Sequence, residues 1–280
     1  MTNRIVLISG ATGQQGGATA RALAGKGFQI RALTRNPDSD AAKALAATGA
    51  ELVKGDLDDE GSLKAALADA WGAYAVQNTW TAGVAGEEAQ GHRFAKAARA
   101  AGVQHFVYAS VASADRKTGI PHFDNKSRVE DTVRSLGFTS YAIIRPVFFM
   151  ENLPSPWFLN GDKLVSALDP KTVLQMIAVS DIGQYGALAF TDERFRNLEL
   201  DIAGDAATMP QTAAILSGAL GRTIEYRQIP MSEIRKNSDD FALMLEWFEA
   251  VGYDADIAGN ASKYGVKPTS LKEWASRLKK

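Results

Sequence analysis

A glycine-rich turn directly after the first apolar run constrains the fold more than any other feature of this chain. Residues 4–9 form a short apolar run, Gly10-Ala11-Thr12-Gly13-Gln14-Gln15-Gly16 follows at once, and an amphipathic run covers residues 16–26. In such a strand, turn and helix, Gly10 permits the tight turn, Gly13 lets backbone approach a pyrophosphate, and Gly16 lets the helix lie close to the strand. The N–H groups of the turn and the positive end of the helix dipole then attract phosphates. The sequence therefore predicts a dinucleotide phosphate site here.

The first 150 residues alternate short apolar runs with longer Ala-rich amphipathic runs, which is typical of βαβ units around a parallel sheet. The candidate strands cover residues 4–9, 29–34, 51–54, 73–77, 105–109 and 140–145. The candidate helices cover residues 16–26, 39–48, 61–68, 87–101 and 125–136. Several of these helices end at a glycine, the residue that most readily takes the left-handed conformation at a helix C-terminus. We expect an α/β protein with a doubly wound parallel sheet of the Rossmann type.

The pattern changes after Pro146, where a less periodic, proline-containing segment predicts a crossover into a second lobe. Residues 179–190 indicate a loop followed by a helix, and residues 197–202 indicate a strand that returns to the edge of the sheet. From Met209 onward the chain is mostly helical, apart from a strand at 223–228. We predict a Rossmann domain over residues 1–150, to which 179–203 return, and a smaller α+β lobe over 151–178 and 204–280.

Composition narrows the possible functional classes. With 31 basic and 32 acidic side chains the formal net charge is −1, so we expect no direct contact with nucleic acid or with an anionic membrane. There is no cysteine, and the three histidines do not stand at metal-ligand spacing, so we expect no metal site. The chain shows neither a secretory signal nor an apolar run of bilayer length. We expect a cytoplasmic protein.

The end of the second strand distinguishes NAD from NADP. There the sequence reads Ala32-Leu33-Thr34-Arg35-Asn36, with no carboxylate to accept the ribose 2′-hydroxyl of NAD. Arg35 can bind a 2′-phosphate through its guanidinium, or it can be a solvated turn residue. The missing carboxylate favours NADP(H) as the cofactor.

The ends of the next two strands supply further candidates. Asp56 follows the third strand, where it can bind the adenine edge of a dinucleotide or cap the helix that begins near Gly61. Gln77 and Asn78 end the fourth strand. Because ligands lie at the carboxyl ends of strands in open α/β sheets, we expect both side chains to lie over the cofactor.

Seven segments, read in order, make the chain resemble the NmrA-like family of atypical short-chain dehydrogenase/reductases: GATGQQG, RALTRN, KGDLDD, HFVYASVAS, HFDNKSRVE, YAIIRPVFFMENL and VSDIG. The GxxGxxG spacing of the first segment is typical of that superfamily. The resemblance spans most of the chain. It implies a Rossmann domain joined to a smaller C-terminal lobe, with NADP(H) in the cleft between them.

The resemblance also implies which residues hold the cofactor. The matching positions are Gly10, Thr12, Gly13, Gln14, Gln15 and Gly16 for the phosphate loop, Arg35 for the 2′-phosphate, Lys126 for the ribose, Pro146, Val147, Phe148 and Phe149 beside the nicotinamide, and Asn152 at the cleft. In this family some members reduce substrates, whereas others only sense the balance of NADPH and NADP⁺.

The chain departs from the superfamily at its catalytic motif. The usual Tyr-x-x-x-Lys is replaced by His122-Phe123-Asp124-Asn125-Lys126, which retains the lysine. His122 is either a surface residue or a proton donor beside the nicotinamide. Imidazole suits the second role because it gives and takes protons near neutrality. Ser110 or Ser113, after the fifth strand, could orient a substrate oxygen. We expect Lys126, His122 and Ser110 to carry the chemistry.

Two functions from different classes fit these features. The first is an NADPH-dependent reductase of a small aromatic, quinone-like or carbonyl acceptor, for which five aromatic side chains offer flat walls or simply fill the core: Trp80, Phe148, Phe149, Trp157 and Phe158. The second is an NADP(H) redox sensor, in which residues 80–86 form a mobile loop that changes a surface offered to a regulatory protein partner. The sequence also leaves a homo-oligomer open.

Overall fold

The computed structural model describes residues 4–278, and the chain divides into two compact units. The first unit contains the residues up to Asp115, together with His122–Arg145 and Ile182–Leu200. The second contains Arg116–Pro121, Pro146–Asp181 and the residues from Asp201 onward. The second unit therefore includes a six-residue stretch, Arg116–Pro121, that the sequence assigns to the first domain.

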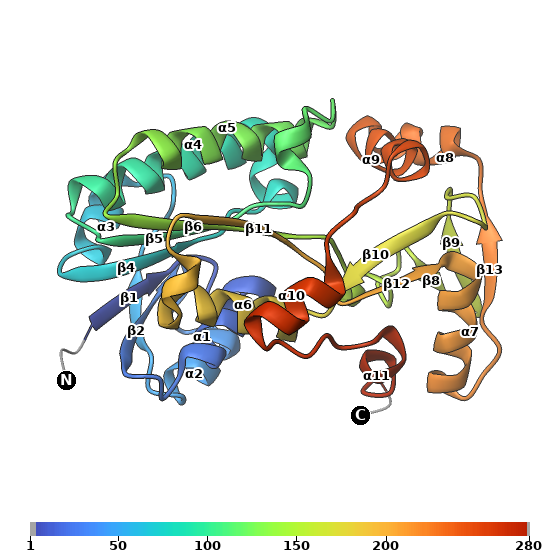
Figure 1. Ribbon diagram of the computed structural model, residues 1–280, viewed down its shortest axis with the longest axis horizontal. Helices are drawn as coiled ribbons and strands as arrows, with labels where there is room; N and C mark the ends of the chain where they lie inside the picture. Colours follow the sequence, from blue (N-terminus) through green and yellow to red (C-terminus); the bar gives the residue numbers. More distant parts are fainter. Residues whose placement is uncertain (1–3, 279–280) are drawn as a thin grey trace. The chain divides into compact units, whose positions relative to one another are not determined.

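A seven-stranded parallel sheet forms the centre of the first unit (Figure 1), which confirms the predicted α/β Rossmann fold. Its strand order is β11-β6-β5-β4-β1-β2-β3. The strands are β1 Arg4–Ile8, β2 Phe28–Thr34, β3 Glu51–Lys54, β4 Ala70–Ala75, β5 His105–Ala109, β6 Ser140–Pro146 and β11 Leu198–Ile202. The order reverses at β1, which pairs with β2 on one side and β4 on the other. Ligands of open α/β sheets bind at such a reversal.

Helices cover both faces of this sheet (Figure 1). One face carries α1 Gln14–Leu23, α2 Asp40–Ala46 and α6 Val179–Thr191; the other carries α3 Glu60–Ala66, α4 Thr79–Ala100 and α5 Pro121–Ser135. The second group packs on the sheet through a fully buried core that includes Leu63, Phe94 and Phe106. On the first face α6 touches the backbone of α1, since a Cβ atom on Gly183 would lie 2.6 Å from the carbonyl oxygen of Ala18. Only glycine permits this approach.

The structure corrects several predicted boundaries. Helix α4 begins at Thr79 instead of residue 87, because Asn78 caps it by accepting a hydrogen bond from the Trp80 N–H, and it bends at Gly83, whose φ is 72°. Residues 80–86 are therefore a broken helix rather than a loop. Helix α5 begins at Pro121 instead of residue 125, since proline suits the first turn of a helix.

Two further boundaries differ for long-range reasons. Residues 179–190 are helical throughout, without the predicted loop, because both carboxylate oxygens of Glu151 accept hydrogen bonds from the Val179 N–H. Strand β4 begins at Ala70 rather than residue 73, where it pairs with Ile5 of β1. Both stabilising contacts join residues distant in the sequence, so local patterns do not reveal them.

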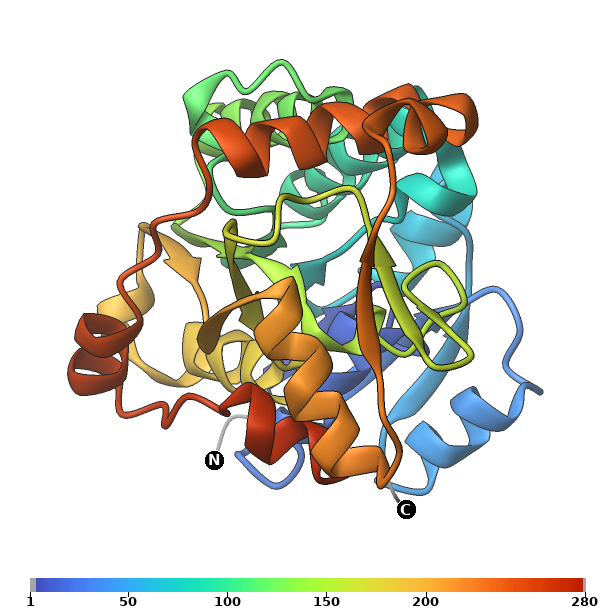
Figure 2. The same cartoon turned by 90° about the vertical axis from the view of Figure 1, so that its right-hand side faces the viewer.

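The second unit contains two three-stranded mixed sheets, with orders β12-β10-β7 and β13-β9-β8. The strands are β7 Phe148–Phe149, β8 Leu159–Asn160, β9 Lys163–Ser166, β10 Val173–Ile177, β12 Asp205–Thr208 and β13 Glu225–Gln228. The helices are α7 Met209–Leu220, α8 Met231–Asn237, α9 Asp239–Ala250, α10 Ile257–Tyr264 and α11 Leu271–Ala275. Helix α7 packs against β9 and β13 (Figure 2).

Within residues 4–278 every helix is too short or too polar to cross a lipid bilayer.

Candidate cofactor-binding site

The glycine turn between β1 and α1 has no room for side chains at its key positions. Gly10 has a φ of 59°, and its carbonyl oxygen accepts a hydrogen bond of 2.9 Å from the Gly13 N–H. A Cβ atom on Gly16 would lie 2.5 Å from that carbonyl oxygen and 2.6 Å from the carbonyl oxygen of Ser9. Such distances are far inside van der Waals contact, so the turn requires glycine for the reason that the sequence predicts.

The N-terminus of α1 is open to solvent at this turn. Gly13 is the N-cap residue and offers no side chain to cap the helix, and the first helical hydrogen bond runs from the Gly17 N–H to the Gly13 carbonyl oxygen. The N–H groups of Gln14, Gln15 and Gly16 thus belong to the first turn, which has no partners inside the helix. Thr12, Gly13 and Gln14 are exposed. The uncapped N-terminus of this ten-residue helix fits an anionic group.

The parallel strands bring the other predicted residues to the same edge of the sheet. Arg35 follows β2 and is exposed, Asp56 follows β3, Gln77 follows β4 and Ser110 follows β5. Because β2 pairs directly with β1, Arg35 and the glycine turn leave neighbouring strands at the same end. A guanidinium at this place suits a phosphate on the adenosine ribose.

Asp56 does not cap α3, which removes one of the two roles that the sequence leaves open. The cap is Asp59, whose side chain accepts a 2.9 Å hydrogen bond from the Gly61 N–H. Asp56 instead accepts a hydrogen bond from the Asp58 N–H, and its own N–H donates to Ser62. Binding of the adenine edge by Asp56 stays a prediction.

Two buried polar side chains at the β4 and β5 ends lack partners. Gln77 is 6% exposed and Ser110 is 3% exposed. Within residues 4–278, neither the amide atoms of Gln77 nor the hydroxyl oxygen of Ser110 makes a hydrogen bond. Buried polar groups are normally satisfied, and those that are not often mark a ligand site. With the glycine turn, this observation shows that the sheet edge fits a bound dinucleotide.

His122 and Lys126 lie one turn apart on α5, so their side chains share one face of the helix. Both are buried, and the His122 ring centroid lies 5.7 Å from that of Trp80, which is 68% exposed. His122 is therefore not a surface residue. Ser113, the alternative to Ser110, is fully buried and has a φ of 66°, beyond the end of β5.

Glu87, which the sequence analysis does not single out, is the hydrogen-bonding centre of this part of the site. Its Oε1 accepts a 2.5 Å hydrogen bond from Lys126 Nζ, and its Oε2 accepts bonds from Asn125 Nδ2, at 3.0 Å, and from the Thr79 hydroxyl. Burial disfavours the charged carboxylate, but Lys126 and the hydrogen bonds outweigh burial and hold the pKa of Glu87 below its usual value. The only sequence signal for Glu87 is an acid inside an Ala-rich helical run.

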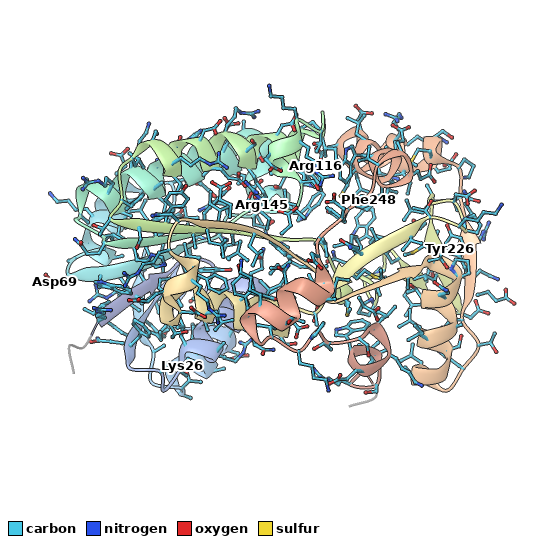
Figure 3. The ribbon with its side chains drawn as sticks, viewed as in Figure 1. Lys26, Asp69, Arg116, Arg145, Tyr226 and Phe248 are labelled. Atoms are coloured by element: carbon cyan, nitrogen blue, oxygen red, sulfur yellow. The ribbon has the colours of Figure 1, made fainter. Side chains whose placement is uncertain are left out.

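A buried ion network holds α5 against the sheet. Glu130 of α5 is fully buried and accepts hydrogen bonds of 2.8 and 2.6 Å from Arg145. Arg145, labelled in Figure 3, lies at the end of β6. Arg145 and Arg134 also donate to Glu199 of β11. Because buried charges are retained only when they are paired, this network fixes the helix that carries His122 and Lys126.

The remaining predicted residues lie in the second unit. Phe148 is 7% exposed on β7 and its ring meets that of Phe158 edge to face at 5.4 Å, so both fill the core of that unit. Pro146, at the end of β6, and Asn152, in the 3-10 turn Met150–Asn152, belong to the same unit, as does the half-buried Phe149. Their contact with a cofactor stays a prediction.

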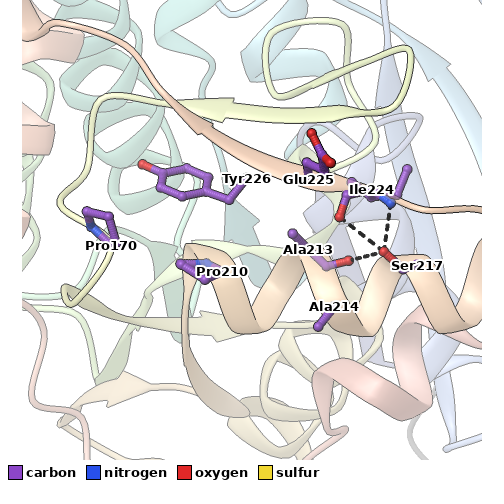
Figure 4. A pocket seen from close by; sticks show the side chains of 8 residues that line it. All are labelled: Pro170, Pro210, Ala213, Ala214, Ser217, Ile224, Glu225 and Tyr226. Carbon is purple, nitrogen blue, oxygen red and sulfur yellow. Dashed lines mark hydrogen bonds between the residues drawn. The ribbon is translucent and has the colours of Figure 1, made fainter.

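A surface cavity of about 710 Å³ lies in the second unit, between α7 and β13 (Figure 4). Its lining is Pro170, Pro210, Ala213, Ala214, Ser217, Ile224, Glu225 and Tyr226. The Ser217 hydroxyl is hydrogen-bonded to backbone atoms of Ala213 and Ile224, and the Tyr226 hydroxyl donates to the Leu168 carbonyl oxygen. The cavity includes none of the predicted site residues, and both of its hydroxyl groups are satisfied.

No group of three or more histidine, aspartate or glutamate side chains among residues 4–278 could hold a metal ion.

The NmrA-like family matches residues 2–275 of this chain. Among solved structures, an NADPH-dependent quinone oxidoreductase from Escherichia coli, complexed with NADPH, has a TM-score of 0.81 and 26% identity, covering 98% of this chain and 100% of that one. A Citrobacter triphenylmethane reductase complexed with NADP(H) has a TM-score of 0.76 and covers 98% of this chain and 99% of that one, but at 22% identity it supports the fold alone.

Curated relatives match over different lengths. The NmrA-like oxidoreductase himF of Aspergillus japonicus is 35% identical over 162 residues, which cover 55% of this chain and 49% of that protein. The match thus spans about half the length of that relative. An NmrA-like family domain-containing protein of Dictyostelium discoideum is 27% identical over 299 residues, covering 98% of this chain and 97% of that one.

Proposed function

Since the chain belongs to the NmrA-like family, we propose that it binds NADP(H) and reduces a small aromatic, quinone-like or carbonyl acceptor. The observation that carries the proposal is the glycine turn, where Gly16 admits no side chain and the N-terminus of α1 is open. The similarity to the NADPH-dependent quinone oxidoreductase of E. coli supports the same function, since the two chains are 26% identical over nearly their full lengths.

Different residues at the sheet edge bind different parts of the cofactor. The N–H groups of Gln14, Gln15 and Gly16 bind the pyrophosphate, and Arg35 binds the 2′-phosphate through paired N–H donors. Asp56 would bind the adenine edge, and the buried amide of Gln77, which makes no hydrogen bond within residues 4–278, would donate to the cofactor. Lys126 holds the nicotinamide ribose.

NADPH, when bound, would supply a hydride to the acceptor. The acceptor oxygen takes a proton from His122, a general acid by its side-chain type, and accepts a hydrogen bond from the Ser110 hydroxyl. The exposed ring of Trp80 lies beside His122, so a planar acceptor can stack on it. Preference for flat, apolar acceptors follows from this ring.

The test is NADPH oxidation with a panel of quinones, triphenylmethane dyes and carbonyl compounds. We expect at least one planar acceptor to accelerate oxidation, and Lys126→Ala to weaken NADPH binding and abolish the acceleration. If no member of the panel accelerates oxidation of bound NADPH, the reductase function is wrong.

A second function, an NADP(H) sensor, is favoured by the break in α4. Residues 79–82 form a short helical segment that ends at Gly83, and this segment carries the exposed Trp80. Rotation at Gly83 would change the surface that Trp80 offers to a protein partner. Hydrogen exchange of residues 79–86 with saturating NADP⁺ and with saturating NADPH tests this function. Equal protection in both states would reject it.

A further inference from the structure

We propose that Glu87 is a positioning residue for the cofactor: it fixes the Lys126 ammonium on the ribose-binding side of the α4–α5 contact. The inference rests on the proposed NADP(H) binding and names a residue that the family motifs in this sequence do not include. Its basis is the set of hydrogen bonds that the buried Glu87 carboxylate accepts.

Glu87 joins two helices that are distant in the sequence, α4 and α5, and also binds a residue on the far side of the break in α4. It lies on α4 and is 1% exposed. On α5 it binds Lys126 Nζ at 2.5 Å and Asn125 Nδ2 at 3.0 Å, and beyond Gly83 it accepts a bond from the Thr79 hydroxyl. Asn125 Nδ2 also donates to the Val84 carbonyl oxygen at 2.9 Å. The carboxylate therefore has one ion-pair partner and two neutral donors, which together fix its orientation.

The same bonds limit where the ammonium can go. Lys126 is 9% exposed, so its charge is costly to bury without a counter-charge. An ammonium has three N–H donors. Glu87 takes one of them, and the other two are left for ribose hydroxyl groups. Without the carboxylate, the flexible lysine side chain would either leave the site for solvent or take other rotamers, and each change weakens ribose binding.

Packing alone would not require this arrangement. Two apolar side chains of similar volume can replace a buried ion pair at little or no cost in stability. A purely structural role would let removal of Glu87 lower the melting temperature without changing the NADPH affinity of the folded protein. A positioning role lowers that affinity, and only while Lys126 is present, because Glu87 acts on the cofactor only through Lys126.

The experiment is a double-mutant cycle with Glu87→Gln, Lys126→Met and the combined variant, in the full chain. NADPH and NADH dissociation constants are measured by calorimetry, and melting temperatures are measured in parallel. The matched control is Glu88→Gln, the same change at the next residue, where Glu88 pairs with Arg128 at the surface.

We expect Glu87→Gln to weaken NADPH binding about tenfold when Lys126 is present and not at all in the Lys126→Met background. NADH binding should weaken by the same factor, because both cofactors share the nicotinamide ribose. Glu88→Gln should leave both constants unchanged. Additive effects of the two single variants, or no effect of Glu87→Gln on a folded protein, would overturn the proposal.

Thr79→Val provides a milder variant if Glu87→Gln does not fold. It removes one bond to Glu87 Oε2 and keeps the ion pair, so we expect about threefold weaker NADPH binding with Lys126 and no change with Lys126→Met. Equal loss in both backgrounds would overturn the proposal. Failure of the unaltered chain to bind NADPH is a separate result, since it would overturn the proposed function itself.

Discussion

The phosphate turn and the α4–α5 contact are both parts of the first unit, but they are built in opposite ways. The turn from Gly10 to Gly16 is one continuous segment that leads into the uncapped N-terminus of α1 and whose glycines leave no room for side chains. The α4–α5 contact brings Thr79 and Glu87 of α4 to Lys126 of α5, which is 39 positions from Glu87, around a buried charge pair. The turn depends on steric fit and the contact on electrostatic pairing. We therefore expect a substitution in the turn to abolish cofactor binding. A substitution in the α4–α5 contact should weaken binding by an amount that depends on which partner residues remain.

The largest effect is expected from Gly16→Ala, which tests the steric half of the comparison. The new Cβ atom would lie 2.5 Å from the Gly10 carbonyl oxygen, so the turn must change shape. We expect NADPH affinity to fall more than about 100-fold, roughly 3 kcal/mol, measured by calorimetry. The control is Gly218→Ala on α7, where a Cβ atom meets nothing within 4 Å. Unchanged affinity for Gly16→Ala would break the comparison.

The pH dependence of the free energy of unfolding should show that the stability of the sheet and cofactor binding at its edge depend on different residues. His105 of β5 is buried between Ser140 and the Ala189 carbonyl oxygen, and burial lowers its pKa from 6.5 to about 4. The unfolded chain therefore binds the proton more tightly, and stability falls as the pH drops below 6.5. The loss is about 2 kcal/mol at pH 5 and approaches about 3 kcal/mol below pH 4.

Urea unfolding from pH 7 to pH 4 measures this loss, and His105→Gln should flatten it. Because His105 begins β5 whereas the site lies where β5 ends, NADPH affinity of the folded variant should be unchanged. An identical pH profile in the variant would show that another group causes the loss.

Arg35→Ala tests whether the turn region distinguishes the two cofactors. Loss of the guanidinium should weaken NADPH binding about 30-fold, close to 2 kcal/mol, and leave NADH binding unchanged, because only NADPH carries the 2′-phosphate. Lys26→Ala removes an exposed cation near the other end of α1 and serves as control. Parallel losses for NADPH and NADH would show that Arg35 does not bind the 2′-phosphate.

The smallest effect should come from Ser110→Ala. Its buried hydroxyl oxygen lacks a partner within residues 4–278, so its removal should raise the free energy of unfolding by about 1 kcal/mol. Acceptor reduction should fall about tenfold with NADPH affinity unchanged. Thermal unfolding and steady-state kinetics measure the two effects. A loss of stability, with normal turnover, would assign Ser110 a structural role only.

The difference between the two regions also explains what the sequence could predict. The turn can be predicted from the sequence because its pattern is local: the glycine spacing and the adjoining strand and helix are sufficient to identify it. Strand ends follow from the parallel topology, so Arg35, Gln77 and Ser110 are correctly brought to one edge. The strands at 51–54 and 105–109 are confirmed at both ends.

Contacts between residues far apart in the sequence could not be predicted from it. Glu87 pairs with a residue 39 positions away, and Glu151 caps α6 from 28 positions away, so neither partner is visible in a local window. The early start of α5 depends on Pro121, and it places His122 on the helix with Lys126. The small sheets of the second unit join short strands, five of which have four residues or fewer, so their periodicity is too brief to predict a strand.

The most direct test of the account is titration of the unaltered protein with NADPH, followed by melting temperature and tryptophan fluorescence. We predict a saturable rise in melting temperature, equivalent to about 2.7 kcal/mol at a concentration 100 times the dissociation constant, and a smaller rise with equal NADH. No change in either signal at millimolar NADPH would contradict the assignment of the glycine turn as a cofactor site.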